Sequence, residues 1–177
     1  MKADNQTFKM INRRNRAAGA LFEQWIQAAC DYYWSKGYAC IEKTPEPMRP
    51  IRPYGERSRG QFIACYVKQA QPDFKGALCD GTCIIFDAKH TEKDRIRQDA
   101  VTETQYRIFE KYESMGAKCF VIVSIGLESF YRIPWNVWKQ MGQMFGHKYM
   151  ASGRELESYK VPLRNCTILF LEGVELG

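Results

Sequence analysis

The chain has 177 residues, with 26 lysines and arginines against 20 aspartates and glutamates, and 45% of its residues are hydrophobic. This length fits one domain, which we expect over residues 1–177, and the apolar content excludes a disordered chain. No apolar run approaches the ~20 residues of a membrane span, and residues 1–16 lack the apolar core of a secretory signal, so we expect a cytoplasmic protein with no membrane partner.

The first predicted element is a basic arm over residues 1–17. Residues 1–18 contain five basic residues and one acidic residue. Clustered positive charge favours a polyanionic partner such as DNA, although solubility alone would also account for it. The candidate DNA-binding residues of this arm are Arg13, Arg14 and Arg16.

An amphipathic helix is predicted after the arm. Apolar residues between Ala18 and Tyr33 recur at spacings of three and four until Gly37 is reached, which predicts a helix of about five turns. Residues 38–43 then combine aromatic and β-branched side chains, which favours a short strand.

An extended, basic protrusion is predicted over residues 44–68. Four prolines fall within residues 45–53. Neither a helix nor a central strand tolerates this density, because proline lacks the N–H donor and fixes φ. The chain is expected to return through a strand over residues 61–68. The candidate DNA-binding residues here are Arg49, Arg52, Arg57, Arg59 and Lys68, to which we add Lys75 in the next segment.

The rest of the chain alternates between strand and helix patterns. The order predicts an α/β fold with a mixed central sheet flanked by helices. The predicted elements are, in chain order, a hairpin of residues 72–78 and 82–89 around Asp80-Gly81, a loop over 90–99, a helix over 101–115 that stops at Gly116, a doubly buried strand over 117–125, a strand over 128–133, a short helix from Pro134 to Trp138 and a last strand over 167–171. Residues 142–165 show no clear pattern.

The cysteines and tryptophans favour a reduced, packed interior. The seven cysteines are scattered and form no C-x-x-C pair, which is typical of buried thiols rather than disulfides. A zinc site of Cys79, Cys83 and His90 lacks a fourth ligand and is disfavoured. Trp135, Trp138 and Met141 could form a dimer interface or the core, and we favour the core for the tryptophans.

Two acids and a lysine form a candidate site for metal-dependent hydrolysis of a phosphodiester. Asp87 and Lys89 are two residues apart in a predicted strand, so both project from the same face. Asp73 lies one hairpin arm away. Two carboxylates can hold Mg²⁺, and the lysine can orient or help deprotonate the attacking water. The alternative is a surface salt bridge at a strand end.

Two polar residues are further candidates. Gln105 interrupts the apolar face of the predicted helix that follows, where it could orient water or phosphate beside the metal, or be a capped or half-buried glutamine. Glu23 lies roughly 60° beyond the apolar stripe of the first helix, at ~100° per residue, so periodicity predicts a solvated glutamate. From the helix margin it could still reach the site as an extra metal ligand.

The spacing of Asp73, Asp87 and Lys89 resembles that of the PD-(D/E)XK nucleases, with Asp in place of Glu at the second acid. More narrowly, the chain resembles the RecU-type Holliday junction resolvases over most of residues 12–140. The segments that carry this resemblance are Asn15-Arg16 with Glu23, Lys43-Thr44-Pro45-Glu46-Pro47, Lys68-Gln69-Ala70, Asp73-Phe74-Lys75-Gly76, Phe86-Asp87-Ala88-Lys89-His90-Thr91, Gln105, Phe120 to Ile125 and Pro134-Trp135.

This resemblance implies a restriction-endonuclease-like fold and a homodimeric, Mg²⁺-dependent crossover junction endodeoxyribonuclease, in which Mn²⁺ substitutes for Mg²⁺. Such an enzyme makes paired nicks in four-way DNA junctions. By resemblance Asp73, Asp87 and Glu23 are metal ligands, Lys89 is the catalytic lysine, and Gln105 lies near the site. Residues 44–68 match the stalk that enters the junction centre. Two alternatives stay open, a nuclease of this fold acting on duplex ends or flaps, and a non-catalytic protein that binds branched DNA.

Overall fold

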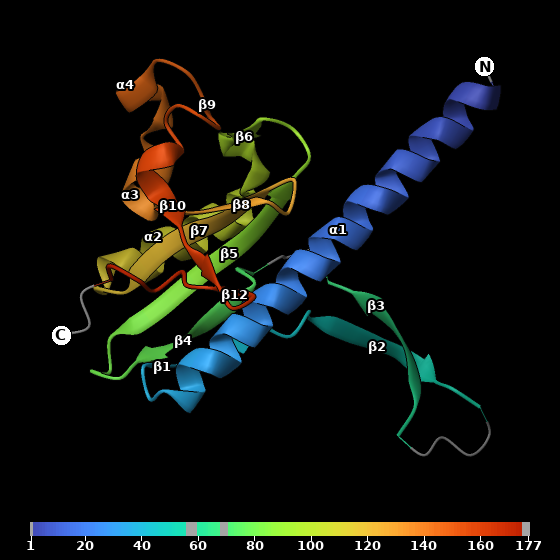
Figure 1. The fold of residues 1–177 in the computed structure, drawn as a ribbon. Coiled ribbons are helices and arrows are strands. Elements are labelled where there is room, and N and C mark those ends of the chain that lie inside the picture. Colours follow the sequence, from blue (N-terminus) through green and yellow to red (C-terminus); the bar gives the residue numbers. More distant parts are fainter. Residues whose placement is uncertain (1, 56–59, 68–70, 175–177) are drawn as a thin grey trace.

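The computed structural model describes residues 2–55, 60–67 and 71–174, with side chains from residue 10 onward (Figure 1). Three of the predicted DNA-binding residues, Arg57, Arg59 and Lys68, lie outside the described residues. Within the described part of the chain, no helix combines the length and the apolarity needed to cross a bilayer.

A six-stranded mixed sheet forms the centre of the fold, as predicted. Its strand order is β1-β4-β5-β7-β8-β10, in which β5 and β7 run parallel and the other neighbours are antiparallel. The strands are β1 (Ala39–Lys43), β4 (Phe74–Leu78), β5 (Cys83–Thr91), β7 (Lys118–Ile125), β8 (Ser129–Pro134) and β10 (Lys160–Val161).

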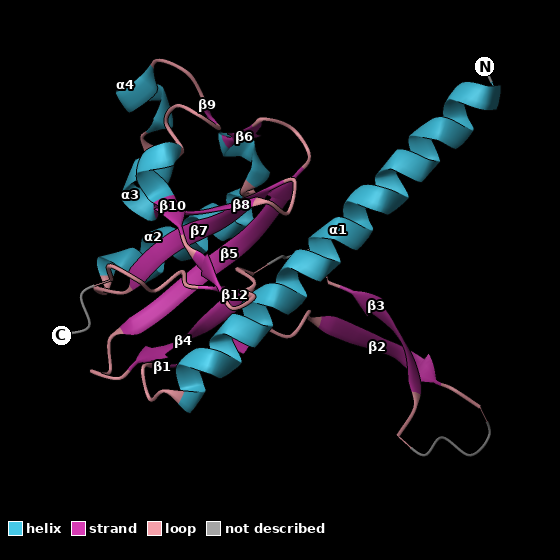
Figure 2. Ribbon diagram, in the orientation of Figure 1, coloured by secondary structure: helices cyan, strands magenta, loops and turns pink. Residues whose placement is uncertain are grey.

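Helices cover both faces of this sheet, which separates two apolar clusters (Figure 2). On one face, α1 (Lys2–Ser35) buries Phe22 and Ile26. On the other, α2 (Glu103–Ser114) and α3 (Trp135–Lys139) bury Phe109, Trp135 and Trp138, so the tryptophans are core residues as favoured. Because β7 is covered on both faces, its continuous apolar run is explained.

The basic arm is not a separate element. Residues 2–17 are the first half of α1, which continues without a break and extends beyond the sheet (Figure 1). The prediction of a helix starting near Ala18 was wrong because it followed the apolar stripe. Residues 2–17 contain no proline and include the helix-favouring residues Lys, Arg, Met and Ala. The helix that packs on the sheet can therefore continue through them.

The Pro-rich segment forms a separate hairpin of β2 (Met48–Pro53) and β3 (Phe62–Tyr66), which extends away from the sheet (Figure 1). A bulge between Pro50 and Arg52 shifts the register. Arg49 and Arg52 therefore oppose Cys65 and Ile63, which are two residues apart, and they share one face of the hairpin. Without the bulge the two arginines would point to opposite faces.

The remaining elements depart from the predictions at several points. Residues 90–99 are not a loop, because β5 reaches Thr91 and a short strand then pairs with a distant partner. The predicted last strand, 167–171, keeps only two strand residues. The remaining elements are β6 (Arg95–Arg97), η1 (Gln98–Ala100), α4 (Met141–Phe145), β9 (Tyr149–Ala151), η2 (Glu157–Tyr159), β11 (Leu163–Arg164) and β12 (Thr167–Ile168).

All seven cysteines are free thiols, as predicted, but only Cys30 is buried. The expectation of burial was wrong for the others. Cys40, Cys79 and Cys166 are exposed, because they stand at strand edges and turns rather than on the core faces.

Candidate active site

The β4–β5 hairpin brings the two predicted acids together. Phe74 pairs with Phe86, which places Asp73 directly before β4 beside Asp87 on β5. The backbone N–H of Asp73 donates to Asp87 Oδ1 at 3.3 Å, and the N–H of Ala88 donates to Asp73 Oδ2 at 3.0 Å. Each carboxylate is thus oriented by the backbone next to the other.

Lys89 completes this pair from the same strand. Its Nζ lies 2.6 Å from Asp87 Oδ2, which confirms that the two side chains share a face. An ordinary surface salt bridge is excluded because the Asp87 side chain is 0% exposed. Burial raises the pKa of Asp87 to about 7, against the opposing attraction of Lys89 and with a smaller contribution from the charge of Asp73.

Gln105 lies at the site, but protein groups occupy both ends of its amide. Nε2 donates to Asp87 Oδ1 at 2.7 Å and to the carbonyl of Gln71 at 3.5 Å. Oε1 accepts from the backbone N–H and the hydroxyl of Thr102. With these partners the buried side chain holds Asp87 rather than a water or a phosphate, so the alternative of a capping glutamine describes it better than the predicted contact with water.

The site contains the polar atoms that the packing leaves unsatisfied. Among the described residues, only Thr44 Oγ1 and Asp87 Oδ2 are buried side-chain N or O atoms without a hydrogen-bond partner. Asp87 Oδ2 does make a 2.6 Å ion pair with Lys89 Nζ. Both atoms lie next to Asp73, whose carbonyl accepts from the N–H of Thr44 at 2.8 Å.

This donor set fits a hard divalent cation. No group of three or more His, Cys, Asp or Glu side chains suited to a metal ion occurs in the described ranges. Mg²⁺ needs only one or two carboxylates, because waters and substrate phosphate oxygens supply its other ligands. Two facing aspartates, one of them with a buried carboxylate oxygen that only Lys89 contacts, meet that requirement.

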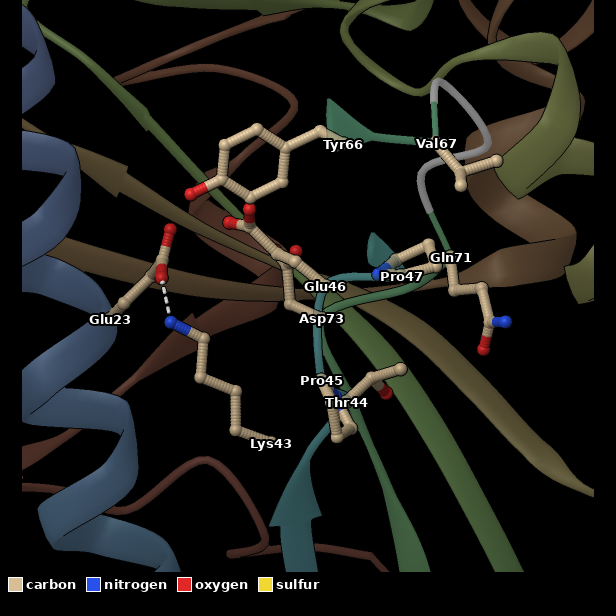
Figure 3. A pocket seen from close by; sticks show the side chains of 10 residues that line it. All are labelled: Glu23, Lys43, Thr44, Pro45, Glu46, Pro47, Tyr66, Val67, Gln71 and Asp73. Atoms are coloured by element: carbon tan, nitrogen blue, oxygen red, sulfur yellow. Dashed lines mark hydrogen bonds and ion pairs between the residues drawn. The ribbon is translucent and has the colours of Figure 1, made fainter. Parts of the chain in front are cut away.

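Glu23 reaches the margin of the same site from α1. Its side chain is 34% exposed, between the solvated glutamate that periodicity predicts and a buried one, and it forms an ion pair with Lys43 of β1 at 2.6 Å (Figure 3). That hydrogen bond raises the pKa of Lys43. Glu23, Lys43 and Asp73 line one cavity of about 220 Å³.

Lys43 is a residue that reasoning from the sequence missed. It lies in the Lys43-Thr44-Pro45-Glu46-Pro47 segment that carries part of the family resemblance. That segment, and the position of Lys43 at the end of the predicted strand, could have identified it as a site residue.

The base of the hairpin lines the same cavity as the acids. Pro45, Glu46, Pro47 and Tyr66 form part of its wall. In Figure 3 the Tyr66 ring extends from β3, with its hydroxyl directed toward Glu23. The hairpin is thereby positioned directly at the candidate active site.

The described candidate DNA-binding residues are all exposed. They lie on three elements, and they are Arg13, Arg14 and Arg16 on α1, Arg49 and Arg52 on the hairpin and Lys75 on β4. Arg14 makes a 3.7 Å ion pair with Glu92, in which its side chain stays 78% exposed. Such a contact leaves the guanidinium available to a phosphate.

Comparisons with known proteins point to one family. The model of the family RecU, Recombination protein U, matches residues 17–174. The chain is similar to the Holliday junction resolvase RecU of Streptococcus oralis, 34% identical over 67% of this chain and 59% of that protein. It is also similar to those of Streptococcus pneumoniae strain Hungary19A-6, 34% identical over 59% and 54%, and Streptococcus gordonii, 29% identical over 75% and 66%.

The chain spans between about half and two thirds of the length of these relatives. Among solved structures it is similar to Hjc of Archaeoglobus fulgidus, a Holliday junction resolvase, with a TM-score of 0.39 and 14% identity over 66% of this chain and 72% of that one. That likeness is too distant to bear on the site.

Proposed function

The chain belongs to the RecU family, and on that premise we propose that it is an Mg²⁺-dependent endonuclease that resolves four-way DNA junctions by paired nicks. The observation that carries this proposal is the close contact of Asp73 and Lys89 with the buried carboxylate of Asp87. Its Streptococcus relatives are named Holliday junction resolvases, which supports the choice of substrate.

Asp73 and Asp87 would hold the cation, and Glu23 is a further candidate ligand once it is released from Lys43. Bound Mg²⁺ would polarise the scissile phosphate and lower the pKa of the attacking water, and Mn²⁺ would substitute for it. Lys89 positions that water through Nζ and offsets negative charge that develops in the transition state. Gln105 keeps Asp87 in the orientation that this chemistry needs.

The substrate geometry follows from the hairpin. We propose that residues 44–68 are a stalk that enters the centre of an open junction, where Arg49 and Arg52 contact phosphates from one face. Arg13, Arg14, Arg16, Arg57, Arg59, Lys68 and Lys75 are the other proposed phosphate contacts. Paired nicks need two active sites, so the proposal includes a homodimer. Each subunit is a single nuclease domain, 1–177, with a restriction-endonuclease-like fold. The proposed enzyme acts in the cytoplasm, where the DNA is.

The test is cleavage of a labelled four-way junction and of a linear duplex of the same sequence, with and without Mg²⁺. Wild-type protein should nick the junction only with Mg²⁺ and leave the duplex intact. Lys89→Ala should reduce cleavage by about 10²-fold or more while junction binding persists, because the lost ammonium acts on the attacking water and on Asp87 rather than on the bound DNA. Lys93→Ala, an exposed lysine outside the site, is the matched control.

Two results would contradict the proposal. Equal cleavage of duplex and junction would indicate a nuclease acting on duplex ends or flaps. Tight junction binding without any Mg²⁺-dependent nicking would indicate a non-catalytic protein that binds branched DNA.

A further inference from the structure

We propose that Thr102 is a positioning residue for the Asp87 carboxylate and acts on it through Gln105; this inference rests on the proposed metal-dependent function. Thr102 is the N-cap of α2. Its backbone N–H and its hydroxyl donate to Gln105 Oε1 at 3.0 and 3.1 Å, and the hydroxyl accepts from the Gln105 N–H at 3.3 Å. The helix cap and the active site therefore share one side chain.

The N–H of Thr102 decides which way the Gln105 amide lies. A backbone N–H can only donate, so the end of the amide that faces it must be the carbonyl oxygen. The NH₂ group then faces Asp87 Oδ1 at 2.7 Å and the carbonyl of Gln71 at 3.5 Å, which both accept. A flipped amide would oppose donor to donor at one end and acceptor to acceptor at the other.

This arrangement assigns separate roles to the two oxygens of Asp87. Oδ1 accepts from Gln105 and from the N–H of Asp73, whereas Oδ2 has only the ion pair with Lys89. The carboxylate cannot rotate without losing the Oδ1 contacts. Oδ2 is thereby kept available to a cation, although Thr102 is itself exposed and makes no contact with Asp87.

Capping and positioning can be separated by the choice of substitution. Thr102→Ser keeps the hydroxyl. Thr102→Asp keeps a good N-cap acceptor for the helix, but it replaces the hydroxyl donor with a carboxylate, a second acceptor facing Gln105 Oε1. Thr102→Val removes the hydroxyl from both contacts and leaves only the backbone N–H on Gln105 Oε1. Thr104→Val, on the same helical turn, is the matched control because its hydroxyl takes no part in this network.

The measurement is Mg²⁺ binding by titration calorimetry without DNA, alongside junction cleavage at graded Mg²⁺ concentrations. Thr102→Ser and Thr104→Val should bind Mg²⁺ like wild type. Thr102→Asp and Thr102→Val should bind it more weakly, on the order of tenfold, the lower end of what loss of an outer-shell partner does. In a Gln105→Ala background, Thr102→Asp should have no further effect, because the coupling runs through the glutamine.

Wild-type affinity in Thr102→Asp would overturn the inference, because only the helix cap would then matter. Weak binding by Thr102→Ser would overturn it as well, since the hydroxyl would not be the cause, and so would an additive loss in the Gln105→Ala background. Wild-type protein that binds Mg²⁺ but does not cut the junction contradicts the proposed function and leaves the role of Thr102 standing. Wild-type protein that binds no Mg²⁺ overturns both.

Discussion

Replacing Asp87 by asparagine should abolish cleavage and at the same time stabilise the metal-free protein above neutral pH. Asp87 is fully buried, and burial is the largest cause that raises its pKa from 3.8 to about 7. At higher pH the folded chain must therefore keep a desolvated charge that Lys89 offsets only in part. Asparagine has nearly the same shape and carries no charge.

The sign and size of the effect follow from linkage. Because the pKa of Asp87 is higher in the folded chain than in the unfolded chain, its contribution to stability is fully present below about pH 4 and is lost as pH rises through about 7. A difference of about three pKa units corresponds to at most roughly 4 kcal/mol. Relaxation of the protein and water penetration make the actual stability difference smaller than this upper limit. For a chain of this size, each kcal/mol of added stability raises Tm by about 2–4 °C.

The assay is thermal unfolding followed by circular dichroism, in EDTA and in Mg²⁺, at about pH 5 and about pH 8. Asp87→Asn should melt above wild type at the higher pH in EDTA, with a smaller difference at the lower pH, and Mg²⁺ should stabilise only wild type. Asp99→Asn, which removes an exposed carboxylate paired with Arg97, should change little. An asparagine variant that is less stable than wild type at both pH values would refute the reasoning.

Three further predictions concern packing and DNA contacts. Gly76→Ala should destabilise the protein by about 3 kcal/mol or more in urea unfolding, because a Cβ would lie 1.9 Å from a carbonyl oxygen of β1, whereas Gly142→Ala, whose Cβ would meet only Lys148 Cγ at an ordinary contact distance of 3.8 Å, should not. Arg49→Ala with Arg52→Ala should lower the slope of log K against log salt for junction binding by about two, and an unchanged slope would remove both residues from the phosphate contacts. Tyr33→Phe should lower the free energy of unfolding by about 1–3 kcal/mol, because its buried hydroxyl accepts a backbone N–H at 2.9 Å; an unchanged unfolding midpoint would contradict this.

The part of the site carried by local periodicity could be predicted from the sequence. Alternation along β5 places Asp87 and Lys89 on one face, and the hairpin spacing brings Asp73 to them. Helical spacing likewise turns Gln105 toward the sheet. In each case the direction of the side chain depends on residues within one element or one short connection. Few other arrangements of these side chains are then possible.

The parts that depend on contacts between distant elements could not be predicted. Periodicity describes how α1 faces the sheet but not that the end of β1 passes beside it, so the Glu23–Lys43 pair was missed. The strand at Arg95–Arg97 exists because a segment more than fifty residues later pairs with it. The length of α1 could not be predicted either, because its first half has no apolar stripe that would indicate a helix.

The chain places its unsatisfied polar groups where the proposed chemistry needs them. Elsewhere in the described core, buried side-chain polar atoms have partners, as is usual in folded proteins. At the site, a buried carboxylate oxygen and a threonine hydroxyl lack them, beside a cavity lined by the base of the hairpin and by the charged side chains of Glu23, Lys43, Glu46 and Asp73. A cation and a phosphate would supply the missing partners. On the proposed mechanism, stability and activity are therefore opposed at Asp87, because the substitution that relieves the folded state also removes an oxygen proposed to bind the metal.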